Sequence, residues 1–173
     1  MSDAARGTSV TAALSETHRR VVVAAMGSEY RRDDGAGLAA MAMVAEQCPD
    51  VLAAGPLSDP LDLLGLWDGA DLAVIIDAVS SGAPPGTVQL MELDPARPEP
   101  AVERRSTGPN STHGIGLVGV YRLARALGRA PARVVVVGIE GEDFGQGAGL
   151  SPAVVRAVPR AAYQVLQLID GAR

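Results

Sequence analysis

Three uninterrupted apolar runs constrain the fold of this chain more than any other feature. In chain order they are RVVVAAM (20–26), DLAVIID (71–77) and RVVVVGIE (133–140). Runs that are rich in valine and isoleucine and lack polar alternation are typical of strands buried on both faces. Stretches with helical periodicity lie at about 34–48, 113–127 and 151–169. This alternation predicts a three-layer α/β/α sandwich with a mostly parallel central sheet.

Shorter patterns complete this outline. VLAAG (51–55) and TVQLMEL (87–93) suit strands, and DPLDLLGLW (59–67) suits a short helix. Residues 1–18 are polar and are expected to form an arm outside a single domain that spans 19–173.

Composition excludes several classes of function. The net charge is −5, lysine is absent and the arginines are scattered, so we expect no nucleic-acid partner. Without lysine, neither Schiff-base chemistry nor a P-loop is possible. The single cysteine, Cys48, cannot form an intrachain disulfide, and no apolar run reaches the roughly 18 residues of a membrane span. We therefore expect a cytoplasmic, monomeric protein with no membrane contact.

Ionisable residues follow or end the predicted strands, where α/β sheets bind their ligands. These residues are Asp33, Asp34, Asp77, His113 and Glu140. Because the carboxyl ends of parallel strands meet at one edge, we expect several of them to gather there. Asp34, Asp77 and His113 offer two carboxylates and an imidazole, which suit zinc or nickel. The alternative is structural: Asp33 and Asp34 would cap a helix, and His113 would be an N-cap or a core histidine.

The segment GIGLVG (114–119) supports a different function. It matches the dinucleotide-binding pattern G-x-G-x-x-G, and Glu140 follows about twenty residues later at a strand end. The pattern requires a strand that runs directly into its first glycine, whereas Gly114 follows the polar stretch RRSTGPNSTH. A nucleotide-binding α/β protein is therefore the weaker hypothesis.

Four segments together resemble the hydrogenase maturation peptidases, which trim the C-terminus of the large-subunit precursor of NiFe hydrogenases. The segments are AMGSEYRRDDGAG (25–37), IIDAVSSGAPPGT (75–87), STHGIGL (111–117) and VVVVGIEGEDFGQGAGLSP (134–152). The family has corresponding blocks in the same order and at similar distances. The resemblance covers roughly residues 20–169.

This resemblance implies an endopeptidase, a protease of the aspartic type, that removes a C-terminal extension from the nickel-loaded precursor, its protein partner. Position by position, it places the metal-contacting residues on Asp34, Asp77 and His113, with Asp34 and Asp77 also catalytic. It implies no organic cofactor, since the metal is the substrate's own nickel, for which zinc or cadmium could substitute in vitro. Water would be activated either by the metal or by an aspartate acting as general base.

The chain departs from the family pattern at three places. Ala25 replaces the first glycine, Ser28 replaces an asparagine, and GPLSDP (55–60) replaces the glycine-rich turn D-G-G-T-x-G. The altered turn motivates an alternative function, that of a non-catalytic chaperone or binding module for the metallated precursor.

The stretch RRDDGAG (31–37) is expected to combine a structural and a chemical role. Asp33 would start a helix while Asp34 faces the metal, and Gly35 and Gly37 would keep the helix end slim enough for a substrate tail. Ser151 is expected to cap the last helix in the same way.

Overall fold

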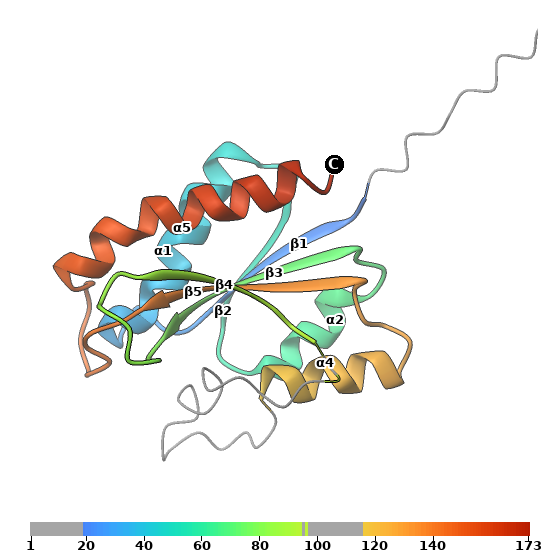
Figure 1. Ribbon diagram of the computed structural model, residues 1–173, viewed down its shortest axis with the longest axis horizontal. Helices are drawn as coiled ribbons and strands as arrows, with labels where there is room; N and C mark the ends of the chain where they lie inside the picture. The colour runs from blue at the N-terminus through green and yellow to red at the C-terminus, as the bar shows by residue number, and fades with distance from the viewer. Residues whose placement is uncertain (1–18, 95, 97–115) are drawn as a thin grey trace, which may run out of the picture.

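A five-stranded sheet in the order β2-β1-β3-β5-β4 forms the centre of the protein, in a computed structural model that describes residues 19–94, 96 and 116–173 (Figure 1). The strands are β1 (Val21–Met26), β2 (Leu52–Leu57), β3 (Leu72–Val79), β4 (Val88–Glu92) and β5 (Arg133–Glu140). β1, β2, β3 and β5 are parallel, and β4 runs antiparallel to β5 at one edge. The predicted sheet is confirmed, with a strand at each expected place.

Helices cover both faces of this sheet. The helical segments are the 3-10 turns η1 (Arg32–Gly35) and η2 (Pro60–Asp62) and the α-helices α1 (Ala36–Gln47), α2 (Leu63–Trp67), α4 (Leu117–Ala126) and α5 (Pro152–Asp170). α1 and α5 pack together on one face, and α2 and α4 lie on the other (Figure 1). The predicted three-layer sandwich is therefore confirmed.

Alternate strand positions fill two separate cores. In β3, Val74 and Ile76 face the layer of α1 and α5, whereas Ile75 faces α2 and α4. On that second side, the rings of Trp67 and Tyr121 pack edge to face with their centroids 5.9 Å apart. Because β3 is covered on both faces, its sequence is apolar without alternation.

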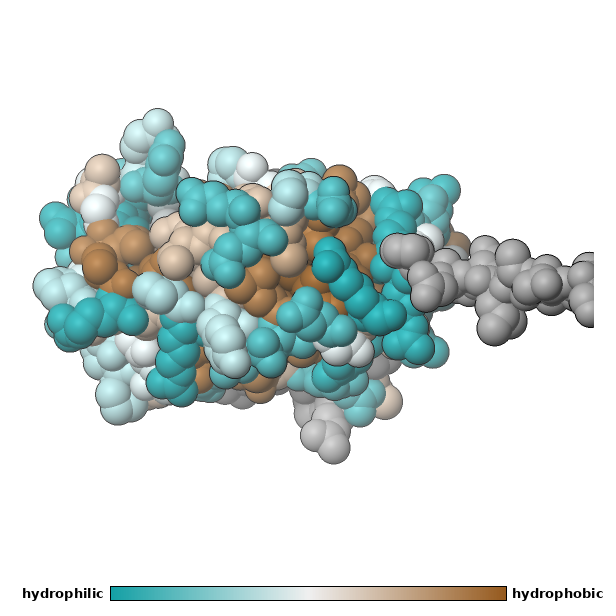
Figure 2. Space-filling model, turned by 90° about the horizontal axis from the view of Figure 1, so that it is seen from above, coloured by the Kyte–Doolittle hydropathy of each residue, from teal (hydrophilic) through white to brown (hydrophobic). Residues whose placement is uncertain are grey.

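The outer surface of the α1–α5 layer is mixed. Figure 2 shows this layer from above, with hydrophilic side chains interspersed with apolar ones. Val155 and Tyr163 of α5 are among the exposed apolar residues. In the described ranges, no helix combines the length and apolar character needed to cross a membrane.

β3 continues beyond its predicted end. The strand runs to Val79, so Asp77 lies inside it, in register with Gly138 of β5. The strands pair through hydrogen bonds between backbone groups, whereas the side chains project from the two faces of the sheet. A carboxylate side chain therefore does not interrupt the pairing. The backbone of Asp77 is therefore fixed by the pairing of β3 with β5.

The helix expected from His113 begins later. α4 starts at Leu117, behind Gly116, which has an extended conformation. His113, the arm 1–18 and most of the connection 94–112 lie outside the described residues.

Gly35 and Gly37 serve packing, which corrects the expectation that they leave space for a substrate. Both residues are buried. A Cβ atom on Gly37 would lie 2.5 Å from the carbonyl oxygen of Ile76, and one on Gly35 would lie 3.2 Å from Cα of Glu29. The missing side chains let the start of α1 approach the backbone of β3 and of the turn before η1.

Gly37→Ala should therefore destabilise the protein by about 1–3 kcal/mol, because the added methyl group overpacks the contact with Ile76. The matched control is Gly65→Ala in α2, where a Cβ would meet nothing within 4 Å. The control should be neutral or slightly stabilising, since alanine favours helix. Urea unfolding measures both variants, and equal midpoints would contradict the packing role of Gly37.

Candidate active site

A cleft of about 430 Å³ opens at the carboxyl ends of β1 and β3. From β1 the chain crosses to β2 on one side and later to β3 on the other, so the cleft lies where the strand order reverses. Its polar lining residues are Ser28, Arg31, Asp34, Ser58, Asp77 and Ser80. Its apolar walls include Met26, Leu57 and Phe144. Two of the predicted site residues, Asp34 and Asp77, are therefore brought together.

Asp34 is positioned by the turn between β1 and η1. The N–H of Ser28 donates to Asp34 Oδ2 at 2.9 Å, and the Asp34 N–H donates to the carbonyl oxygen of Arg31 at 3.1 Å. Gly27 has a φ of 104°, and a Cβ there would collide with the Asp34 carbonyl oxygen, so only glycine fits. Burial raises the pKa of Asp34, although the charge of Arg31 and the bond from Ser28 oppose the rise.

Asp77 lines the same cleft from β3. Burial raises the pKa of Asp77 to about 7, the negative charge of Asp34 adds to the rise, and a hydrogen bond from the Ala78 backbone opposes it. The two carboxylates thus interact electrostatically across the cleft. The negative charge of Asp34 therefore favours the protonated form of Asp77.

The third predicted metal contact, His113, lies outside the described residues. Within residues 19–94, 96 and 116–173, no three histidine, cysteine, aspartate or glutamate side chains gather closely enough to hold a metal ion. The described part of the cleft offers the carboxylates of Asp34 and Asp77 as oxygen donors, which suit a borderline divalent metal when joined by an imidazole.

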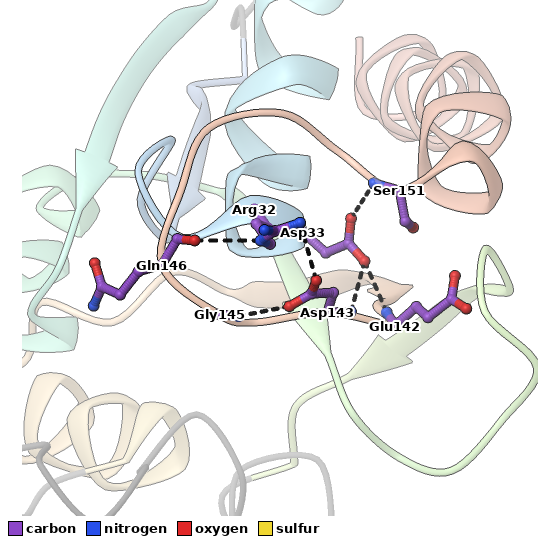
Figure 3. Close-up of polar contacts among 7 residues, drawn as sticks. All are labelled: Arg32, Asp33, Glu142, Asp143, Gly145, Gln146 and Ser151. Atoms are coloured by element: carbon purple, nitrogen blue, oxygen red, sulfur yellow. Dashed lines mark hydrogen bonds and ion pairs between the residues drawn. The ribbon is translucent and has the colours of Figure 1, made fainter.

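Asp33 points away from the cleft and does not cap its own helix, contrary to the prediction. Its side chain is fully buried and accepts three backbone hydrogen bonds (Figure 3). Ser151 N donates to Oδ1 at 2.6 Å, and Glu142 N and Asp143 N donate to Oδ2 at 2.8 and 2.9 Å. Burial alone would raise the pKa of Asp33, but these hydrogen bonds outweigh it, and the pKa lies below its ordinary value.

Ser151 precedes α5 as expected, yet its hydroxyl makes no capping bond to the helix. The carboxylate of Asp33 instead receives the backbone N–H of Ser151 just ahead of the first turn. A negative charge at this position is stabilised by the helix dipole. The beginning of α5 is thus held by a residue that lies more than a hundred positions earlier in the chain.

Arg32 joins the same two segments. It has a φ of 51°, forms an ion pair with Asp143 at 3.2 Å and donates from Nε to the carbonyl oxygen of Gln146 at 3.3 Å (Figure 3). The backbones also pair, because Arg32 N donates to Gly147 O at 2.9 Å. The left-handed conformation turns the chain so that Asp33 enters the loop while Asp34 enters the cleft.

Glu140 ends β5 near the cleft but does not line it. Its carboxylate accepts hydrogen bonds from Ser81 N at 3.0 Å, Ser81 Oγ at 2.7 Å and Gly82 N at 2.8 Å. Glu140 is therefore committed to holding the loop after β3, which corrects the expectation that it joins the other ionisable residues. The nucleotide-binding hypothesis loses the acidic residue on which it relied.

The sequence did not single out several residues of the cleft. Arg31 lies three positions before Asp34, and Ser80 comes directly after β3. Phe144, the only phenylalanine of the chain, belongs to the loop after β5. Its presence in an otherwise polar, glycine-rich segment was the available signal, because an isolated aromatic residue in such a loop usually packs against something.

Comparisons with known proteins agree with this architecture. The model of the HycI hydrogenase maturation protease family matches residues 38–168. The hydrogenase expression/formation protein HoxM of Cupriavidus necator is 27% identical over 140 residues, which cover 79% of this chain and 67% of HoxM. The hydrogenase maturating endopeptidase HybD from E. coli superposes with a TM-score of 0.73 at 26% identity, over 88% of this chain and 93% of HybD.

A second solved structure, the hydrogenase maturation protease HybD from Thermococcus kodakarensis, has a TM-score of 0.65 at 26% identity, over 87% of this chain and 99% of its own. Since the family model spans most of the domain, this chain belongs to the hydrogenase maturation protease family. It is therefore a hydrolase of the class that cuts peptide bonds.

Asp77→Asn should stabilise the protein at pH 8. The folded pKa of about 7 lies above the ordinary 3.8, so the folded state binds the proton more tightly than the unfolded state. Wild-type stability therefore falls as the pH rises from 3.8 to about 7, and the variant does not share this loss. Thermal unfolding at pH 4 and pH 8 measures the difference. An advantage for the variant that is no larger at pH 8 than at pH 4 would contradict the assigned environment of Asp77.

Asp33→Asn should cost about 1–3 kcal/mol at neutral pH, because an amide cannot accept all three backbone hydrogen bonds. The depressed pKa of Asp33 means that the wild-type advantage is complete above pH 3.8 and shrinks as the pH falls through the folded value. Asp50→Asn, at an exposed carboxylate between α1 and β2, is the matched control and should be neutral. Urea unfolding at pH 7 and pH 3 provides the test, and equal stability of the two variants at pH 7 would refute this role.

Proposed function

We propose that this protein is an endopeptidase that removes a C-terminal extension from the nickel-loaded large-subunit precursor of a NiFe hydrogenase. The observation that carries the proposal is the pairing of Asp34 and Asp77 in one cleft at the switch point of the sheet. The family to which the chain belongs supplies the reaction class.

Asp34, Asp77 and His113 would contact the nickel of the substrate in this proposal. The metal arrives with the precursor, so it acts as a checkpoint: only a metallated precursor would be held with its C-terminal segment in the cleft. Carboxylate oxygens and imidazole nitrogen are suitable ligands for nickel, and zinc or cadmium could take its place in vitro. No organic cofactor is needed.

Asp34 and Asp77 are also the proposed catalytic residues. A carboxylate beside the peptide bond can take a proton from the attacking water, and the metal can polarise water or carbonyl oxygen. Either route uses the same pair of side chains. Neither route requires a covalent nucleophile, which agrees with Cys48 lying at the far end of α1, away from the cleft.

The intact mass of a nickel-loaded precursor, incubated with the protein, tests this function. Wild-type protein should release a short C-terminal peptide, and nickel-free precursor should stay uncut. Asp34→Asn, Asp77→Asn and His113→Ala should each slow release by at least about 100-fold while remaining folded. Asp50→Asn should process normally, because Asp50 precedes the start of β2, at the other end of the parallel strands from the cleft. Full activity of all three site variants would refute the proposal.

A non-catalytic chaperone or binding module for the metallated precursor is the second candidate. The departure GPLSDP (55–60) favours it, because Leu57 and Ser58 of this segment line the cleft itself. This function would give a stable complex with nickel-loaded precursor and no change in precursor mass. The same experiment therefore separates the two candidates.

A further inference from the structure

We propose that Arg31 binds the carbonyl oxygen of the peptide bond that is cleaved, an inference that rests on the proposed peptidase function. Among the described residues that line the cleft, Arg31 is the one positively charged side chain. It shares this cleft with Asp34 and Asp77. A donor with a permanent charge thus lines the same cleft as the two acids.

The backbone of Arg31 is held in place relative to Asp34. Arg31 N donates to the carbonyl oxygen of Ser28 at 3.2 Å, and the carbonyl oxygen of Arg31 accepts from Asp34 N at 3.1 Å. Arg31 also forms an isolated parallel bridge with Gly147 of the last loop. The backbone that carries the Arg31 side chain is therefore fixed relative to Asp34.

The guanidinium group of Arg31 has donors to spare. Within the described part of the chain it makes one hydrogen bond, from Nη2 to the carbonyl oxygen of Phe144 at 3.5 Å, which is at the long limit for such a bond. An arginine side chain carries five N–H donors. Most of them remain available to a ligand in the cleft.

Hydrolysis of a peptide bond is accelerated by a donor of this kind. Water adds to the carbonyl carbon, a C–O bond forms and the π pair of the C=O group moves onto its oxygen. Collapse then restores the C=O group and breaks the C–N bond, while the nitrogen takes the proton that the water released. The negative oxygen of the intermediate is stabilised by preorganised donors.

The other groups of the cleft are less suited to this task. When ionised, Asp34 and Asp77 only accept hydrogen bonds, a protonated Asp77 is an uncharged donor, and Ser28 N is already bound to Asp34 Oδ2. The hydroxyls of Ser58 and Ser80 can donate, but bonds from a charged donor are roughly twice as strong as bonds from a neutral one. Arg31 is therefore the donor that gains most as charge develops.

Arg31→Ala tests the inference with nickel-loaded precursor in single-turnover cleavage under excess enzyme. The cleavage rate should fall about 100–1000-fold, whereas the affinity for the precursor should change less than about tenfold. Added guanidinium ion at millimolar concentration should restore part of the rate, because it can occupy the vacated position. Arg31→Lys should have an intermediate rate, since it keeps the charge and loses the planar fork.

Arg129→Ala is the control, because Arg129 is exposed and lies before the start of β5, at the other end of the parallel strands from the cleft. It should cleave at the wild-type rate with no response to guanidinium. Failure of wild-type protein to cut the precursor would defeat the proposed function itself. If wild-type protein cuts, the role of Arg31 is overturned by an Arg31→Ala rate equal to the control, or by a slow rate that guanidinium does not restore. Should Arg31→Ala fail to fold, a wild-type rate for Arg31→Lys overturns it.

Discussion

The buried carboxylate of Asp33 is the interaction on which the geometry of this site depends. It accepts backbone hydrogen bonds from Glu142, Asp143 and Ser151, so it ties the turn after β1 to the loop after β5 and to the start of α5. Phe144, which forms one wall of the cleft, belongs to that loop. A buried charge is costly unless it is fully hydrogen-bonded, and here the partners are supplied by backbone distant in sequence.

Two adjacent aspartates thus have opposite roles because their environments differ. The pKa of Asp33 is lowered, since its hydrogen bonds from the backbone outweigh its burial, whereas the pKa of Asp34 is raised by burial that its partners do not overcome. Arg32 directly precedes the two acids and has a left-handed conformation. The side chain of Asp33 enters the loop after β5, whereas that of Asp34 enters the cleft. Asp33 therefore stabilises the structure, whereas its neighbour Asp34 is placed in the cleft.

The cleft combines features that suit peptide hydrolysis. The charge of Asp34 opposes ionisation of Asp77, Arg31 adds a positive charge, and Met26, Leu57 and Phe144 form apolar walls. The altered segment 55–60 forms part of this wall rather than a distant surface. The departure from the family pattern therefore lies at the cleft itself, while the sheet and both helix layers keep the architecture of the family.

Much of the fold was predictable because strands buried on both faces leave an unmistakable apolar signal. The apolar runs that form β1, β3 and β5 predicted the parallel sheet. Ligands of such sheets bind beyond the carboxyl ends of the strands, and this rule placed Asp34 and Asp77 in one site. The end of β3 was not predictable, because backbone pairing is indifferent to a single carboxylate such as Asp77.

The sequence by itself determined the class of fold, the family and the pair of acids in the cleft. Only the tertiary structure decided what each remaining polar residue does. Asp33 and Glu140 resemble site residues in the sequence, yet both hold loops, because their partners are backbone N–H groups of distant segments. Backbone donors are present at every residue except proline and carry no sequence signature, so their pairing with a side chain appears only when the chain is folded.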